Sequence, residues 1–389
     1  MTTGAEAVAA ARALAATLVD RSAAIDADGR IPDDVVADLR ASGVAGLWLP
    51  AELGGSEASP DEVVDAIAML AAADGSTGWC AAVSVGTSAL AAYLPEDGAR
   101  EIFASPSVLT GGSFNPAGRA TATGGPTADI RVTGRWGFGS GSAHNDWMCG
   151  ACLMVDETGA LVADAGGRPE ALVAFLPSHS VTVADTWHTS GLRGTGSHDF
   201  SVEALDVPRR HTLGFDFTPW PAGPMWRMPP MSLFFGPFAA VALGLARGAI
   251  DDLVELAQTK TPYRSTRRLA DRDVVQSMVA RAEAATRSAR AFLLETIGGL
   301  AAGAAAGDPV TLHDRAISRL AATHATHAAM TAVDLCFEAA GSSALFLEHP
   351  LQRRHRDVHA VGQHVALAFS GYETVGRVLF GLEPDTALL

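Results

Sequence analysis

Hydrophobic and polar positions change their spacing twice along the chain, and the two changes divide it into three parts. Up to about residue 105, apolar residues recur every three or four positions, as they do on amphipathic helices. From 106 to 215, short alternating runs rich in Val, Thr and Gly indicate strands joined by tight turns. From 216 onward the helical spacing returns. The pattern predicts an α+β protein with an N-terminal helical domain (1–105), a central β domain (106–215) and a C-terminal helical domain (216–389).

Start and stop signals place the individual elements. Ser59-Pro-Asp-Glu combines an N-cap serine with proline at the first helical position, and predicts a helix that runs to about Ala73. The β segment has the short strands and turn spacing of a sandwich or barrel. Four long helical segments with short connections follow it and predict an antiparallel four-helix bundle. The other N-terminal helices are expected at 5–20, from Pro32 to Gly43, at 77–93 and at 95–103, and the bundle helices at 233–258, 272–303, 309–341 and 350–381.

Composition narrows the class of protein. The 389 residues carry a formal net charge of −15, which disfavours a nucleic-acid surface because such a surface needs clustered basic residues. We expect a cytoplasmic protein with no signal peptide and no membrane span. Cys149 and Cys152 form a C-x-x-C pair, but their apolar setting favours buried free thiols over zinc ligands.

The stretch from Gly134 to Trp147 is the first candidate site. Trp136, Phe138 and Ser140 alternate with glycines, so on a regular strand all three side chains would share one face. A flat aromatic wall with a hydroxyl at its edge could seat a planar ligand such as a flavin. The alternative is a β-hairpin that packs two aromatic rings into a core.

The order of the three parts, together with several spaced motifs, resembles the acyl-CoA dehydrogenase fold. Within that superfamily the chain resembles the two-component flavin-dependent monooxygenases that act on phenols, polyketides, thiophenes and amino sugars. The motifs that carry the resemblance are Asp74-Gly-Ser-Thr-Gly-Trp79, Gly134-Arg-Trp-Gly-Phe-Gly-Ser-Gly141, Trp187-His-Thr-Ser-Gly-Leu-Arg-Gly-Thr-Gly-Ser197, and His349-Pro-Leu-Gln-Arg353 with Arg356-Asp357 and His364.

The resemblance implies a flavin-dependent monooxygenase rather than a dehydrogenase. Common dehydrogenases of this fold carry a Glu-Gly base where this chain has His364 and Val365. The first alternative is an acyl-CoA dehydrogenase or oxidase whose catalytic base has moved to Asp251, Asp252 or Glu255. A non-catalytic flavin-binding scaffold is the second alternative.

The resemblance also implies roles for particular residues. Ser140 would hydrogen-bond the flavin near N5, and His364 would face the flavin as a second catalytic residue. The expected flavin-binding residues are Trp136, Phe138, Ser140, Gly141, Arg193, Thr195, Ser197, Arg264, Arg353 and Arg356. The expected substrate-pocket residues are Trp79, Ser84, Thr87 and His144. For Arg353 and Arg356 a structural ion pair at a subunit interface is the alternative, and Arg267 or Arg268 could replace Arg264.

The implied cofactors are reduced FMN or FAD and dioxygen. No nucleotide-binding G-x-G-x-x-G follows a strand, which fits reduction of the flavin by a separate NAD(P)H-dependent flavin reductase. Thr87 stands where related phenol hydroxylases carry a histidine, so we expect an aromatic or polycyclic substrate of secondary metabolism: a larger aromatic polyketide, an indole or another heteroaromatic compound, or an amine. A homotetramer is implied as well. No metal site is expected, because His324 and His327 lack a nearby group of carboxylates in the sequence.

Overall fold

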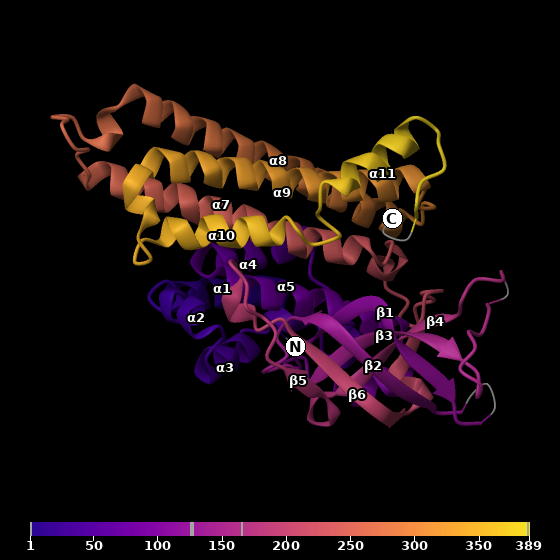
Figure 1. The fold of residues 1–389 in the computed structure, drawn as a ribbon. Coiled ribbons are helices and arrows are strands. Elements are labelled where there is room, and N and C mark those ends of the chain that lie inside the picture. The colour runs from indigo at the N-terminus through magenta and orange to yellow at the C-terminus, as the bar shows by residue number, and fades with distance from the viewer. Residues whose placement is uncertain (1, 125–127, 165, 387–388) are drawn as a thin grey trace.

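The computed structural model describes residues 2–124, 128–164, 166–386 and 389. Its C-terminal helices form a layer that lies across both other parts. The N-terminal helices lie beneath one end of this layer and the β domain lies beneath the other (Figure 1). The predicted α+β class, with a helical part, a β part and a second helical part in that order, is confirmed.

The N-terminal part is built around one buried helix. Every residue of α5 is buried, and this helix packs against α4, α7 and strand β1. Ser59 caps α4 as expected, in a capping box with Glu62. The helix α2 was not predicted, because it is only two turns long and follows α1 almost directly. The helices are α1 (Gly4–Leu18), α2 (Ser22–Asp28), α3 (Asp33–Ala41), α4 (Pro60–Ala73), α5 (Gly75–Ala89) and α6 (Glu96–Ile102).

The β domain is one seven-stranded sheet in the order β5-β6-β2-β1-β3-β4-β7. β1 and β3 pair in parallel, and the other neighbours pair antiparallel. β4 and β6 lie four places apart in this order and still contact each other, so the sheet curls around its own apolar core. The strands are β1 (Thr110–Ala122), β2 (Ile130–Gly139), β3 (Trp147–Val155), β4 (Ala171–Pro177), β5 (Thr182–Ala184), β6 (His198–Val207) and β7 (Thr212–Gly214).

The aromatic pair of β2 does not share a face, contrary to the prediction. The pairing of β2 with β6 shifts register between Trp136 and Gly139, and Phe138 has a left-handed φ of 62°. A bulge of this kind re-aims one side chain. Trp136 is therefore 1% exposed, whereas Phe138 is 73% exposed.

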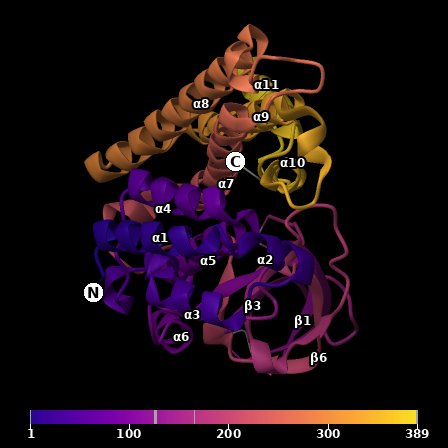
Figure 2. The same cartoon turned by 90° about the vertical axis from the view of Figure 1, so that its left-hand side faces the viewer.

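The C-terminal part contains four packed helices and a fifth short one. α7 runs between the N-terminal helices and the rest of the bundle (Figure 2). It is long and apolar enough to cross a membrane, but 94% of its apolar 18-residue segment is buried inside the protein, as expected of a central core helix. The helices are α7 (Ser232–Thr259), α8 (Asp273–Ala306), α9 (Leu312–Ala340), α10 (Pro350–Val361) and α11 (Ser370–Leu379).

The last bundle helix was predicted as continuous over 350–381, and this is wrong. α10 ends at Val361, and turns occupy 362–369 before α11 begins. A Cβ at Gly362 would come within 2.6 Å of the Met330 sulfur, so glycine allows the chain to pass close to α9 there. His364 consequently lies in a turn between two helices and not on a helix face.

The C-x-x-C pair does not form a binding site. Cys149 and Cys152 are three residues apart on β3, so they point to opposite faces of the sheet. Cys149 belongs to the main core, and Cys152 belongs to the core of the β domain. Both are buried free thiols, as expected.

Candidate active site

Trp79 joins the three parts of the chain at one place. It lies in the first turns of α5, which Asp74 caps by accepting the Thr77 N–H at 2.7 Å. The indole Nε1 donates to Ser140 Oγ at 3.0 Å, at the end of β2. On its other sides the indole stacks on Phe238 of α7 at 5.0 Å and meets the edge of His364 at 5.2 Å. The predicted proximity of Ser140 and His364 is therefore mediated by Trp79.

Ser140 is the outer end of a directed chain of hydroxyl groups. Ser140 Oγ lies 2.8 Å from Ser197 Oγ, which lies 2.7 Å from Thr195 Oγ1. Thr195 donates its single hydroxyl hydrogen to the Leu192 carbonyl at 2.8 Å. Ser197 must then donate to Thr195, and Ser140 must donate to Ser197. Ser140 accepts from Trp79, and its oxygen keeps one lone pair for a further donor.

His364 is held as a neutral imidazole of defined tautomer. Its Nδ1 accepts the backbone N–H of Ala366 at 3.3 Å, so the hydrogen of the neutral ring resides on Nε2. Burial among aromatic rings lowers the pKa of His364 to about 4. The pKa of His364 therefore lies well below neutral pH. Within the described residues Nε2 has no hydrogen-bond partner, so it offers a free N–H donor at neutral pH.

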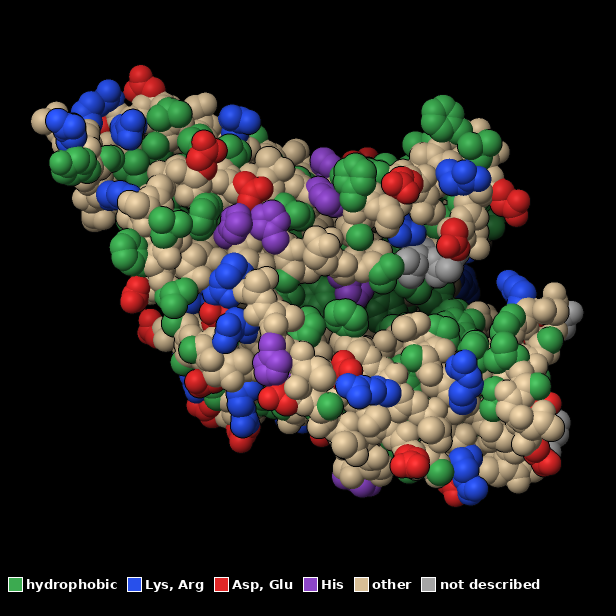
Figure 3. All heavy atoms as spheres, viewed as in Figure 1, with side chains coloured by type: hydrophobic (Ala, Val, Ile, Leu, Met, Phe, Trp, Pro, Cys, Tyr) green, Lys and Arg blue, Asp and Glu red, His purple; other side chains and the backbone are tan. Residues whose placement is uncertain are grey.

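Aromatic rings extend from His364 along one wall. Phe238 contacts His364 edge-on at 4.9 Å, Phe234 lies one turn earlier on α7, and Phe114 of β1 contacts Phe234 at 5.3 Å. Figure 3 shows a hollow between the helical layer and the β domain in which hydrophobic side chains gather. A hollow with apolar walls and few polar groups is the usual form of a small-molecule site.

Three comparisons with known proteins agree on the family. Residues 5–102 match the acyl-CoA dehydrogenase N-terminal domain, and residues 237–369 match the acyl-CoA dehydrogenase C-terminal domain. The indole-3-acetate monooxygenase of Pseudomonas putida is 34% identical over 92% of this chain and 90% of its own. The chain belongs to the flavin-dependent monooxygenases of the acyl-CoA dehydrogenase fold.

Two solved structures support the same assignment. The 3-HSA hydroxylase of Rhodococcus sp. RHA1 superposes with a TM-score of 0.89 at 27% identity, covering 99% of both chains. XiaF from Streptomyces sp., solved in complex with FADH2 and glycerol, superposes with a TM-score of 0.90 at 27% identity over 99% of this chain and 98% of that one.

The carboxylates that would make this monooxygenase a dehydrogenase lie elsewhere. Asp251 is 13 residues beyond Phe238 on α7, which places it about 20 Å further along the helix. Asp251 pairs with Arg247, and Asp252 pairs with Arg354 at 2.5 Å. Glu255 is exposed one turn further on. The relocated base therefore finds no support at the site around His364.

Part of the expected flavin wall lies outside the site. Trp136 stacks on Phe200 at 5.2 Å, and its Nε1 donates to the Ala151 carbonyl, so it belongs to the core of the β domain. Phe138 packs its edge on Trp187 at the surface. Gly141 uses its N–H to donate to the Thr195 carbonyl, which holds the end of β2 against the loop after Leu192.

Three of the expected cofactor arginines are tied to α2. Arg193 Nε donates to the Asp26 carbonyl at 2.9 Å, and Arg353 donates to Ser22 Oγ at 2.6 Å. Arg356 pairs with Asp26 at 2.7 Å. These contacts are structural links within one chain. The Arg356–Asp26 contact is an ion pair, as in the structural alternative, whereas the Arg353 contact is a hydrogen bond to a neutral hydroxyl.

Arg264 does not join the site within this chain. It lies exposed on the loop between α7 and α8, at the end of the bundle away from the β domain (Figure 1). Arg267 and Arg268 of the same loop pair with Asp273 and Asp271.

The remaining pocket candidates lie at element junctions. Ser84 Oγ accepts the Thr110 N–H at 3.3 Å, and Thr87 Oγ1 lies 2.5 Å from Thr110 Oγ1, so both join α5 to β1. His144 lies at the contact with α3, where its carbonyl accepts from Arg40. Burial and the charge of Arg40 lower the pKa of His144 to about 4. None of the three contacts Trp79 directly in the hydrogen-bond and ring contacts of the described residues.

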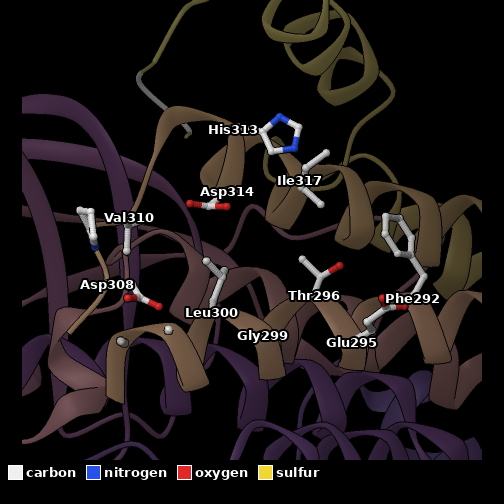
Figure 4. Close-up of a pocket in the computed structure, with 13 residues that line it drawn as sticks. Phe292, Glu295, Thr296, Gly299, Leu300, Asp308, Val310, His313, Asp314 and Ile317 are labelled. Carbon is white, nitrogen blue, oxygen red and sulfur yellow. The ribbon is translucent and has the colours of Figure 1, made fainter. Parts of the chain in front are cut away.

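A separate cavity of about 410 Å³ lies between the end of α8 and the beginning of α9. Figure 4 shows Glu295, Asp308, Asp314 and His313 around it. It is a polar recess of the bundle, and neither Ser140 nor His364 lines it. The cluster of Ser140, Trp79 and His364 is therefore the candidate active site.

Phe114, Phe234 and Phe238 were not singled out from the sequence. Phe234 and Phe238 are four residues apart on an apolar helix, which is also the pattern of ordinary core residues. The only available signal was the density of aromatic residues at the start of α7, and it does not separate a ligand wall from a core.

Proposed function

We propose that this monooxygenase is the oxygenase component of a two-component system. It would take reduced FMN or FAD from a separate NAD(P)H-dependent flavin reductase and oxygenate a small aromatic substrate in the hollow beside Trp79. The observation that carries the proposal is the meeting of Ser140, Trp79 and His364 from three parts of the chain. Reduced flavin, when bound, would supply the electrons that activate dioxygen for transfer of one oxygen atom.

The donor and acceptor pattern of the site fits reduced flavin. Because the hydrogen of Ser140 is committed to Ser197, Ser140 presents an acceptor. The N5 atom of reduced flavin carries a hydrogen and needs an acceptor, whereas N5 of oxidised flavin needs a donor. Nε2–H of His364 offers the complementary donor, which could hold an oxygen atom of dioxygen or of the substrate.

The walls favour an aromatic substrate without charge at the reacting end. Phe114, Phe234 and Phe238 offer ring faces and edges, against which a planar substrate gains both burial and ring contacts. The names of similar proteins, such as the indole-3-acetate monooxygenase, agree with this chemistry. We also propose that the enzyme acts in the cytoplasm and takes part in secondary metabolism.

The test is a single turnover. The protein is mixed without oxygen with reduced FAD or FMN and indole-3-acetate, and then exposed to isotopically labelled dioxygen. We expect a product that carries one labelled oxygen atom, and a Ser140→Ala variant that yields less product and more hydrogen peroxide. Ser142→Ala is the matched control, because Ser142 donates to the Gly196 carbonyl outside the chain of hydroxyls. Reoxidation of the flavin at its free rate, with no labelled product from several aromatic acids and phenols, would refute the proposal.

A further inference from the structure

A cluster of two histidines and one aspartate lies on the outer face of the bundle. Asp334 comes from α9, and His355 and His359 come from α10; their ligand atoms all lie within 4.8 Å of one another. Asp334 Oδ1 is 2.9 Å from Nε2 of His359 and 3.2 Å from Nε2 of His355. Figure 3 shows histidine side chains gathered beside an acidic side chain over α9 and α10. This cluster is separate from the hollow that holds Ser140 and His364.

The two helices hold these three side chains in an arrangement that is typical of metal ligands. His355 and His359 are four residues apart on a helix, so they lie on one face, and their ring centroids are 4.6 Å apart. Two histidines at this spacing form a common half of a zinc site. The carboxylate from the adjacent helix supplies the third ligand. Tetrahedral bonds of about 2.0 to 2.1 Å put ligand atoms roughly 3.3 Å apart, which is close to the two distances from Asp334 to the histidines.

The chemistry of the cluster also suits a cation. Nε2 of His355 and Nε2 of His359 both approach Oδ1 of Asp334, whereas an ordinary ion pair would involve only one histidine. The ring of Phe337 packs at 4.5 Å against His355 and fixes its orientation. The side chains are 34% to 50% exposed, which leaves room for a water molecule as the fourth ligand.

We propose that Asp334, His355 and His359 form a binding site for Zn²⁺ that ties α10 to α9. Imidazole and carboxylate ligands in a tetrahedral arrangement favour zinc over Mg²⁺ or Ca²⁺, which prefer six or more oxygen ligands. α10 also carries Arg353, Arg356 and Asp357, which contact the N-terminal part and the loop at Leu192. Zinc would therefore stabilise the position of this helix without entering the active site.

The test is a titration of tag-free, metal-free protein with Zn²⁺ against a chromophoric chelator. We expect one Zn²⁺ per chain, no competition from Mg²⁺, and visible d–d bands of a tetrahedral complex when Co²⁺ replaces Zn²⁺. His355→Ala and His359→Ala should each weaken binding more than about tenfold, because each removes one of three protein ligands. His188→Ala is the matched control: His188 lies 3.6 Å from Asp185, in a histidine–aspartate pair elsewhere, and its loss should leave zinc affinity unchanged.

Thermal unfolding provides a second measurement. Saturating Zn²⁺ should raise the melting temperature of the natural protein by about 2 to 4 °C, and should not raise that of the His355→Ala/His359→Ala double variant. Unfolding of each variant without metal shows that it is folded before titration. If the protein binds no Zn²⁺ stoichiometrically, or if the folded double variant binds it as tightly as the natural protein, the site does not exist.

Discussion

The hydroxyls of Ser140, Ser197 and Thr195 can be ordered by counting hydrogens, because each side chain has one hydrogen to give. The order makes Ser140 an acceptor toward the hollow, and it depends on two residues that lie further from the hollow. Ser197 is a positioning residue in this view, since it acts through Ser140.

Ser197→Ala should change which flavin form the protein prefers. Without its acceptor, the Ser140 hydrogen becomes free to point into the hollow, so binding of oxidised flavin should improve relative to reduced flavin. A single hydrogen bond contributes about 1 kcal/mol, so the ratio of the two dissociation constants should shift roughly fivefold. Fluorescence titration with oxidised flavin, and anaerobic titration with reduced flavin, measure both constants. Equal changes in both would show a merely structural role, and Ser142→Ala serves as the control.

The lowered pKa of His364 predicts a pH dependence of stability. In the unfolded chain histidine titrates near 6.5, and in the folded protein at about 4. Between these values the unfolded state binds more protons, so stability is full above about pH 6.5 and falls as the pH drops toward 4. From about pH 7 to about pH 5, His364 should account for a loss of about 1 to 2 kcal/mol. Denaturant unfolding of His364→Gln should show a smaller loss over this interval; an equal loss would assign it to other groups, such as His144.

At the scale of elements, the loop after Trp187 is fastened to α10. The Leu192 N–H donates to the buried carboxylate of Asp357 at 2.6 Å, and Arg356 donates to the Ser190 carbonyl. Burial raises the pKa of Asp357 to about 7, because the charged carboxylate loses its hydration at this junction. Because Leu192 also accepts from Thr195, α10 helps to position the chain of hydroxyls.

Gly191→Ala tests this fastening. A Cβ at Gly191 would lie 2.2 Å from the Arg356 carbonyl oxygen, so the loop and α10 would have to separate. We expect a loss of about 1 to 3 kcal/mol in the free energy of unfolding. Gly298→Ala in α8 is the control, since a Cβ there meets nothing within 4 Å and alanine favours the helix. A loss no larger at Gly191 than at Gly298 would contradict the close approach.

At the scale of the whole molecule, the C-terminal part exposes many apolar side chains. Large apolar side chains that are exposed on a single chain are commonly covered when chains associate. We propose that copies of the chain associate through this part as a homotetramer. The exposed side chains in this part include Tyr263, Leu345, Phe346, Leu347, Phe369 and Phe380.

Light scattering tests the oligomeric state. A homotetramer should have a mass of about 160 kDa, four times the 40.1 kDa of one chain. Phe346→Asp/Leu347→Asp should lower this mass, because two charges would oppose burial of this exposed segment between chains. A mass of one chain at micromolar concentration would refute the tetramer.

The sequence by itself determined the order of the three parts and most helix positions, and its motifs indicated the family and suggested Ser140 and His364 as candidates. These depend on periodicity, capping residues and local motifs, which act between residues close in the chain. Only the tertiary structure decided that Trp136 is buried and Phe138 exposed, because a bulge breaks the alternation that the sequence suggests. It likewise placed Trp79 between Ser140 and His364, tied the arginines to α2, and ended α10 before His364. Those features depend on contacts between segments that are far apart in the sequence, and no local sequence pattern specifies such contacts.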